Sequence, residues 1–248
     1  MPKMDSSTKE LKPQSFDIEL RNVSFGYDAR QIINNVSLKV PQETICAFVG
    51  PSGSGKTTVC NLIARFWDVQ EGQVLVVGQD VKGFTADSLM RYISMVFQNV
   101  YLFYDTIENN IRFGNPDATH ERVVEAAKRG RCHAFFSDLP QGYGTVVGEG
   151  GSTLSGGEKQ LISIARAILK DAPIIILDEA NTSVGSENEY QLLAAFRELT
   201  KGKTLVSIAH RLTTVRDAEQ ILVVKNGWIT QRGTHSRLMV QEGTYQSS

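Results

Sequence analysis

The sequence Gly50-Pro51-Ser52-Gly53-Ser54-Gly55-Lys56-Thr57 decides the fold of this chain. It matches the pattern G-x-x-x-x-G-K-[ST], in which glycines allow the backbone to curl tightly around an anion. The apolar run Thr44–Val49 precedes it, and a helical pattern, Lys56–Phe66, follows it. A strand, a glycine-rich loop and a helix in this order predict a phosphate-binding loop within an α/β fold.

The residue types of this loop each suit phosphate binding. Backbone N–H groups surround phosphate oxygens, and the following helix adds the positive end of its dipole. Lys56 is expected to reach the terminal phosphates as a catalytic residue, and the Thr57 hydroxyl is expected to bind Mg²⁺. A flexible turn is the alternative, which the flanking strand and helix disfavour. The candidate cofactor-binding residues here are Gly50, Ser52, Gly53, Ser54, Gly55, Lys56, Thr57 and Thr58.

A second candidate feature is the apolar strand Ile174–Leu177, which runs directly into Asp178-Glu179. In a parallel sheet such a strand delivers its terminal carboxylate beside the phosphate loop. We expect Asp178 to hold the Mg²⁺ shell and Glu179 to polarise an attacking water as a general base. Without the phosphate loop, a solvated strand end that caps the next helix would be the better interpretation.

The third feature is Leu154-Ser155-Gly156-Gly157-Glu158, at the start of a helical pattern. Ser155 with Glu158 three residues later forms a capping box. Glycine is unfavourable in a helix, but at a helix start it lets an anion approach bare N–H groups. Ser155, Gly156 and Gly157 are therefore candidate cofactor-binding residues, and the chain carries two phosphate-binding devices that one nucleotide in one compact core does not easily explain.

The rest of the chain predicts an α/β fold with a P-loop NTPase (RecA-like) core. Apolar alternation over 16–40 indicates an N-terminal antiparallel β subdomain, and helical periodicity indicates an inserted helical subdomain at about 99–170. Buried strands separated by helices indicate a parallel sheet covered on both faces. Near the C-terminus we expect a hairpin through Asn226-Gly227 and a last helix at about Ser236–Val240.

Composition narrows the function classes. Of the 248 residues, 41% are hydrophobic and 21% charged, as in ordinary globular proteins. The formal net charge of -1 argues against nucleic acid as a partner. Three cysteines without metal-ligand spacing favour reduced thiols. Residues 1–15 are polar and indicate either a linker or a frayed natural terminus, which composition alone does not separate.

Together, the residues Gly50–Thr57, Leu154–Glu158 and Asp178-Glu179 resemble the motifs of the ABC ATPases, and the resemblance covers nearly the whole chain. It implies ATP and Mg²⁺ as cofactors and a head-to-tail dimer with a second, identical or different, ABC ATPase domain. ATP would lie between the phosphate loop of one subunit and Ser155-Gly156-Gly157 of the other.

Further roles follow from the resemblance alone. Tyr27 is similar to the aromatic residue that stacks on adenine. Gln98 is similar to the glutamine that contacts Mg²⁺ and the attacking water, and His210 to the histidine that contacts the γ-phosphate. From their residue types alone, these three would be a hairpin residue, a polar loop residue and a capping histidine.

Three segments resemble exporter-type members of the family: Tyr101–Ile111, Val147–Gly151 and Ala209–Leu212. This implies that ATP hydrolysis drives substrate translocation, with a transmembrane domain as partner, at the cytoplasmic face of the cell membrane. Since exporters are commonly fused to their membrane domain, the resemblance also implies that residues 1–15 are a linker from an absent membrane domain and that 16–248 is the ATP-binding domain. Two positions depart from the family pattern: Gly185 replaces a usual aspartate, and Leu161 replaces a usual arginine. The first departure puts in doubt how tightly the two ATP sites of the dimer communicate. The second puts in doubt the local contacts of the helix that begins at Leu154–Glu158, the signature motif of the family.

Two alternatives remain open. A soluble ABC ATPase of DNA repair or chromosome structure would carry a long coiled coil, and one acting in translation would carry two such domains in tandem; this chain has neither feature. A regulatory module that binds ATP without turnover is compatible with Gly185 and Leu161. A steady-state ATPase assay distinguishes this regulatory module from the exporter domain.

Overall fold

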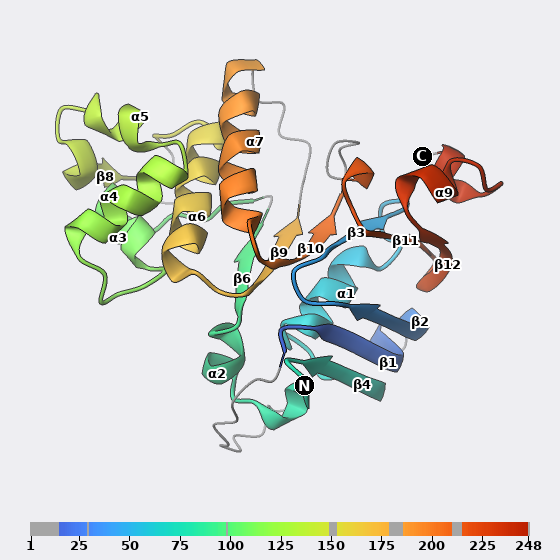
Figure 1. Cartoon of the computed structure of the whole chain (residues 1–248). Coiled ribbons are helices and arrows are strands. Elements are labelled where there is room, and N and C mark those ends of the chain that lie inside the picture. Colours follow the sequence, from blue (N-terminus) through green and yellow to red (C-terminus); the bar gives the residue numbers. More distant parts are fainter. Residues whose placement is uncertain are drawn as a thin grey trace. The chain divides into compact units, whose positions relative to one another are not determined.

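The computed structural model describes residues 15–28, 30–97, 99–148, 153–178, 186–209 and 215–247. Contacts along the chain divide it into two units (Figure 1). The first unit contains the described parts of 1–93, 173–179 and 202–248, and the second contains those of 94–172 and 180–201. The catalytic candidates Gln98, Glu179 and His210, together with Gly185, lie outside the described residues.

An antiparallel sheet opens the first unit, as the alternating N-terminal sequence predicts. Its strands are β1 (Ile18–Tyr27), β2 (Arg30–Val40), β4 (Glu71–Val76) and β5 (Gln79–Asp80), in the order β2-β1-β4-β5. The apolar alternation shifts between Leu20 and Val23 because the pairing of β1 with β2 is irregular there. Ile18, Leu20 and Val23 are all buried.

A second, mixed sheet carries the phosphate loop. Its strands are β3 (Ile45–Val49), β6 (Ile93–Val96), β9 (Ile174–Asp178), β10 (Thr204–Ile208), β11 (Gln220–Lys225) and β12 (Trp228–Gly233), in the order β12-β11-β3-β10-β9-β6. β3, β9, β10 and β11 pair in parallel, and only β12 is recorded as antiparallel, to β11. The carboxyl ends of β3 and β9 therefore point the same way.

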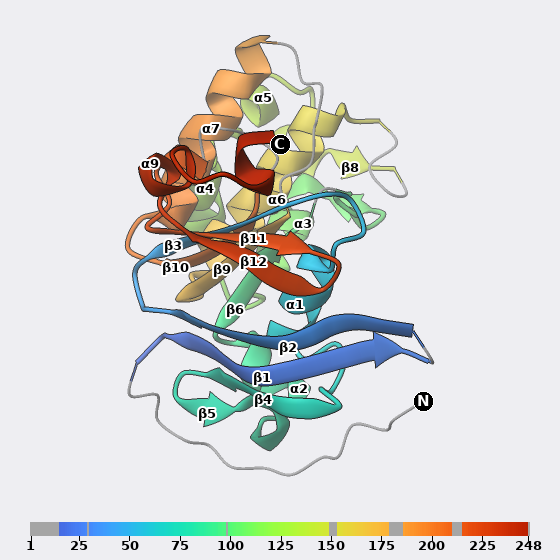
Figure 2. The ribbon, with the colours of Figure 1, turned by 90° about the vertical axis from the view of Figure 1, so that its right-hand side faces the viewer.

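Helix α1 (Lys56–Ile63) lies between the two sheets of the first unit and contacts strands of both (Figure 2). It ends three residues before the expected Phe66. Arg65 has a left-handed φ of 54°, which stops the helix, and its buried guanidinium binds the Phe84 carbonyl and the Asp68 carboxylate. This unit also contains a 3₁₀ helix (Val81–Gly83) and α2 (Ala86–Met90).

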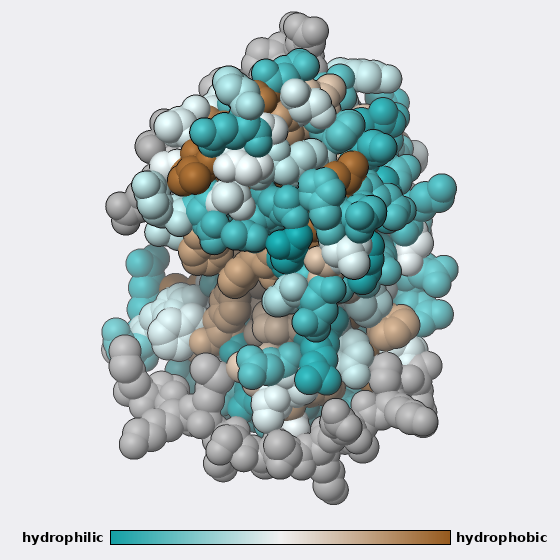
Figure 3. Space-filling view, turned by 90° about the vertical axis from the view of Figure 1, so that its left-hand side faces the viewer, coloured by the Kyte–Doolittle hydropathy of each residue, from teal (hydrophilic) through white to brown (hydrophobic). Residues whose placement is uncertain are grey.

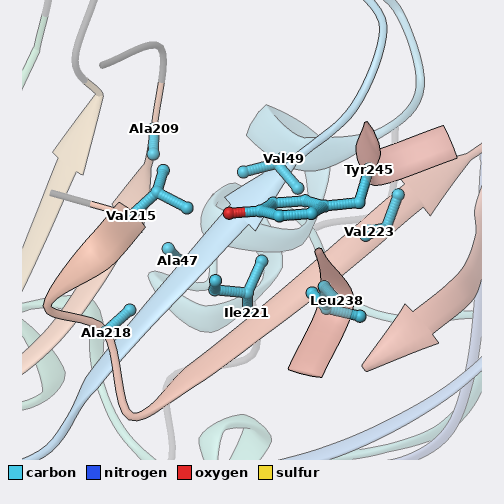
Figure 4. Packing of buried hydrophobic residues seen from close by; sticks show 9 residues of the cluster. All are labelled: Ala47, Val49, Ala209, Val215, Ala218, Ile221, Val223, Leu238 and Tyr245. Carbon is cyan, nitrogen blue, oxygen red and sulfur yellow. The ribbon is translucent and has the colours of Figure 1, made fainter. Parts of the chain in front are cut away.

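The opposite face of the mixed sheet is closed by the C-terminal segment. Helix α9 (His235–Leu238) and the 3₁₀ turn Thr244–Ser247 follow β12, where the sequence predicts a last helix. Figure 4 shows the ring of Tyr245 over the sheet, and His235 Nδ1 lies 2.6 Å from its hydroxyl oxygen. Tyr245 belongs to a cluster of buried hydrophobic residues, which consists of Ala47, Val49, Ala209, Val215, Ala218, Ile221, Val223, Leu238 and Tyr245.

The second unit is mainly helical. It contains α3 (Ile107–Arg112), α4 (His120–Arg129), α5 (His133–Ser137), a 3₁₀ turn (Gly142–Gly144), α6 (Gly156–Lys170), α7 (Ser186–Thr200), and the short strands β7 (Asp105–Thr106) and β8 (Val146–Val147). α6 is central, in contact with α3, α4 and α7. Because of this packing, α7 belongs to the same unit as the helical segment expected at about 99–170.

The three cysteines are free and buried. Burial raises the pKa of the Cys46 and Cys132 thiols to about 12, and it also raises the pKa of Cys60. Neutral buried thiols are poor nucleophiles and poor metal ligands, so they pack as small apolar residues. Among the residues that the structure describes, no helix combines the length and apolarity needed to cross a membrane.

Candidate functional site

Two glycines of the phosphate loop are required by the fold itself. Gly50 and Gly55 have φ values of 139° and 109°, which L side chains rarely adopt. A Cβ atom on Gly50 would stand 2.1 Å from the Val224 carbonyl oxygen, and one on Gly55 would stand 2.7 Å from Ile33 Cδ1. The loop is thus pressed against β11 on one side and β2 on the other.

A hairpin turn supports the loop from outside. The Gly227 N–H donates to the Ser54 carbonyl at 3.0 Å, and the Gly227 carbonyl accepts from the Asn34 N–H at 3.0 Å. The Asn34 side-chain amide donates to the Asn226 carbonyl at 3.2 Å. The sequence predicts this turn only as a hairpin. The sequence does not predict its contact with the loop, since Gly227 and Ser54 meet only through the tertiary fold.

Lys56 lies inside the curl of the loop, with 6% of its surface exposed. Its ammonium donates to the carbonyls of Gly50 and Pro51, both at 2.8 Å, and to Ser54 Oγ at 3.4 Å. Burial lowers the pKa of this ammonium, and the charge of Asp178 opposes the shift. The loop therefore holds a cation at its centre, where backbone N–H groups and the α1 dipole also favour an anion.

Asp178 is the last residue of β9 and is partly exposed. Its negative charge opposes the lowering of the Lys56 pKa and adds to the raising of the Cys60 pKa. β9 runs parallel to β10, and β10 runs parallel to β3, so Asp178 ends its strand at the same edge of the sheet from which the loop begins, as the strand-end motif predicts. Thr57, also predicted as a metal ligand, is exposed in the first turn of α1. A hydroxyl and a carboxylate are hard oxygen donors of the kind that Mg²⁺ takes, so these residues fit that ion.

The remaining loop candidates differ in exposure. Ser52 and Gly53 are exposed at the tip, whereas Ser54 and Thr58 are buried. Tyr27, the predicted base-stacking residue, ends β1 and has 36% of its surface exposed. The first unit thus contains the whole phosphate loop, Asp178 and Tyr27.

The signature turn, residues Leu154–Glu158, lies in the second unit at the start of α6. Ser155 Oγ accepts from the Glu158 N–H at 3.3 Å, and Glu158 Oε2 accepts from the Ser155 N–H at 2.7 Å, which completes the predicted capping box. Gly156 is exposed and Gly157 is buried. Outside its own helix backbone and chain neighbours, no described heavy atom lies within 4 Å of the place where a Gly156 Cβ would stand.

Comparison with known proteins gives consistent matches. The family model described as "ABC transporter" matches residues 33–182, more than half of the chain. The ATP-dependent lipid A-core flippase of Syntrophus aciditrophicus is 47% identical over 236 residues, which cover 95% of this chain and 39% of that protein. The protein of the same name from Salmonella typhimurium is 43% identical over 97% of this chain and 42% of its own.

A solved structure extends the match to three dimensions. The bacterial Atm1-family ABC exporter with ATP bound has a TM-score of 0.91 and 39% sequence identity, over 98% of this chain and 43% of that chain. The present chain therefore spans about two fifths of the length of the proteins that it matches.

Proposed function

The chain belongs to the ABC transporter family, and from that premise we propose that it is the ATP-binding and ATP-hydrolysing domain of an exporter. The observation that carries the proposal is the phosphate loop, which encloses the Lys56 ammonium at the carboxyl ends of parallel strands, where β9 ends in Asp178. Both charges needed at a nucleoside triphosphate are then available: a cation for the phosphates, and a carboxylate, which is a hard oxygen donor, for the metal.

Nucleotide binding would exchange internal contacts for contacts with phosphate. The Lys56 ammonium, now bound to the Gly50 and Pro51 carbonyls, would donate to the terminal phosphate oxygens, while loop N–H groups surround the others. Thr57 and Asp178 would hold Mg²⁺, with Gln98 as a further ligand proposed by resemblance. The ion would neutralise charge that develops on the phosphates.

Hydrolysis needs a base close to the terminal phosphate. Glu179 directly follows Asp178, the last residue of β9, and a carboxylate can take a proton from an attacking water. We assign Glu179 as the general base, Gln98 as a residue that orients the water, and His210 as a γ-phosphate contact. These three assignments rest on their positions in the family motifs.

The signature turn supports a site shared by two copies. Gly156 stands at an exposed helix N-terminus, and no heavy atom of the described residues beyond its own helix lies within 4 Å of where its Cβ would stand, so an anion from outside the chain could approach the first-turn N–H groups. We propose that ATP binds between the phosphate loop of one copy and Ser155-Gly156-Gly157 of the other. In a two-fold dimer this yields two equivalent sites.

A transmembrane domain is the second proposed partner, at the cytoplasmic face of the membrane. Exposed aromatic rings gather in the second unit: the Phe103 ring centroid lies 5.6 Å from that of Tyr101 and 4.8 Å from that of Phe113. The central carbon of the Arg166 guanidinium lies 5.9 Å from the Phe103 ring centroid. Figure 3 shows a face on which hydrophobic patches interrupt a mainly hydrophilic surface. Exposed apolar patches of this kind mark contact surfaces. The names of the relatives favour a lipid as the transported substrate.

Steady-state ATP hydrolysis by this chain with Mg²⁺ tests the proposal. We expect Lys56→Ala to reduce turnover at least about 100-fold, since it removes the only charge that the loop itself supplies to the phosphates. The matched control is Lys201→Ala, which removes an exposed lysine in the turn directly after α7 and should leave turnover unchanged. Turnover by Lys56→Ala within twofold of the parent would refute this assignment of the loop, and a parent that binds ATP without turnover would favour the regulatory module.

A further inference from the structure

Tyr27 does not stand alone at the end of β1. Its ring lies 5.0 Å from the Phe25 ring and 5.3 Å from the Trp67 ring, at interplanar angles of 89° and 82°. Phe25 and Trp67 also contact each other, with ring centroids 6.3 Å apart. Phe25 is buried, whereas Trp67 is 39% exposed. The Tyr27 ring therefore packs edge to face against one buried and one exposed aromatic ring.

The backbone just before Tyr27 pairs with β2, where Gly26 lies opposite Gln31, and the side chain of Gln70 holds it further. The Gly26 N–H donates to Gln70 Oε1 at 3.0 Å, and Gln70 Nε2 donates to the Gly26 carbonyl at 3.0 Å. Residue 26 must be glycine, because a Cβ atom there would stand 2.4 Å from the Arg30 carbonyl oxygen. One amide thus satisfies both polar groups of the residue that sets the direction of the Tyr27 side chain.

Trp67 and Gln70 belong to one short segment between α1 and β4. Arg65 and Asp68 pair within it at 2.9 Å, and the Lys82 ammonium donates to the Val69 carbonyl at 3.2 Å. The segment is therefore anchored to the structure around it. Helix α1 begins at Lys56 of the phosphate loop. The segment that follows α1 therefore links this helix to Trp67 and Gln70, the two residues that contact Tyr27 and Gly26.

We propose that Trp67 and Gln70 are positioning residues for nucleotide binding, which hold the Tyr27 ring as a preformed platform for the purine base. This inference rests on the proposed function, because it requires a nucleotide at the phosphate loop. A tyrosine at an unsupported strand end would lose rotamer freedom when a base stacks on it, whereas a ring already held loses less. The two residues act on affinity for the base and not on the chemistry at the γ-phosphate.

The test compares a ligand with a base to one without. Kd is measured for ATP and for inorganic triphosphate, which presents the phosphates alone. Trp67→Ala and Gln70→Leu should each raise Kd for ATP about 3- to 10-fold, the range expected for the loss of one ordered side chain. Kd for triphosphate should stay within twofold, and kcat should also stay within twofold while KM rises.

Two controls sharpen this experiment. Trp67→Phe keeps an aromatic wall and should restore most of the ATP affinity. Phe66→Ala removes an adjacent exposed aromatic residue that has no recorded ring contact with Tyr27 in the described chain, and it should have no effect. With Trp228→Phe, Trp67 becomes the sole tryptophan of the chain, and its emission should respond to ATP but not to triphosphate.

Each outcome decides between explanations. Equal weakening of ATP and triphosphate in Trp67→Ala would mean a general structural role and would overturn the inference, as would unchanged affinity for both. A parent that binds triphosphate but not ATP would overturn it too, while leaving the phosphate loop intact. A parent that binds neither ligand would refute the proposed function itself, and the inference with it.

Discussion

The phosphate loop and the signature turn are both glycine-rich starts of helices, yet their glycines stand in opposite surroundings. Gly50 is pressed against the Val224 carbonyl and Gly55 against Ile33, and both have left-handed φ values. Gly156 has ordinary helical surroundings and open space where its Cβ would stand. The packing of the described residues accounts for Gly50 and Gly55, but it gives no reason for a glycine at 156.

This difference indicates where each glycine is needed. A side chain at 50 or 55 would collide within the chain, whereas a Cβ at 156 would meet no neighbouring atom among the residues that the structure describes. Glycine costs stability in a helix, so its presence at 156 favours a function that requires a bare backbone there. An anion bound by a second copy is such a function.

The largest expected effect is on stability, from Gly50→Ala. The added Cβ would stand 2.1 Å from a backbone oxygen at a φ of 139°, so strain and overpacking together should lower the free energy of unfolding by about 3 kcal/mol or more. The control is Gly53→Ala, which has a left-handed φ but open space within the described chain. Equal urea midpoints for the two variants would contradict the claim that packing requires Gly50.

The next effect is on turnover, from Glu179→Gln, which keeps the shape of the side chain and removes the base. Turnover should fall about 10²- to 10⁴-fold while ATP binding persists. Because bound ATP joins two copies, size-exclusion chromatography with ATP and Mg²⁺ should show a stable dimer. Adding Gly156→Asp to this variant should abolish the dimer. A monomer of Glu179→Gln at saturating ATP, or a dimer that persists when Gly156→Asp is added, would count against the shared site.

The smallest effect, and the one that most sharpens the comparison, comes from Gly156→Ala. Alanine is the better helix former, so the free energy of unfolding should rise by a few tenths to about 1 kcal/mol, while turnover falls. Chemical denaturation and a steady-state assay of the same preparation give both values. A destabilised protein, or a stabilised one with full turnover, would show that the exposed glycine has no role outside its own helix.

Features fixed by local sequence were predictable. The phosphate loop follows from its motif, the capping box from Ser155 and Glu158, and the buried strands from their apolar runs. The end of α1 was predicted wrongly, because the helix stops before Arg65, which has a left-handed φ and whose guanidinium bonds to Asp68 and to the Phe84 carbonyl.

Contacts between distant segments were not predictable from one sequence. The Asn34 amide meets Asn226 across 192 residues, and Gln70 meets Gly26 across 44. No periodicity or motif marks such pairs, because only the tertiary fold brings them together. The roles of Gln98, Glu179 and His210 stay predictions, since these residues lie outside the described part of the chain.

The central claim is that one nucleotide site combines the phosphate loop of one copy with the signature turn of another, and a mixing experiment tests it most directly. Lys56→Ala damages only the loop. Gly156→Asp places a carboxylate at the anion site, while an acidic residue in the first turn still suits the helix dipole. Each variant alone should show little turnover, because every site in its dimer contains one damaged element.

In a mixed dimer, two-fold symmetry places both damaged elements in one site and leaves the other site intact. The account predicts that mixing the two inactive proteins at dimer-forming concentration restores ATP turnover, up to about a quarter of the parent rate if copies pair at random. Turnover of the mixture that equals the sum of the separate rates, with mixed dimers verified by cross-linking, would contradict it.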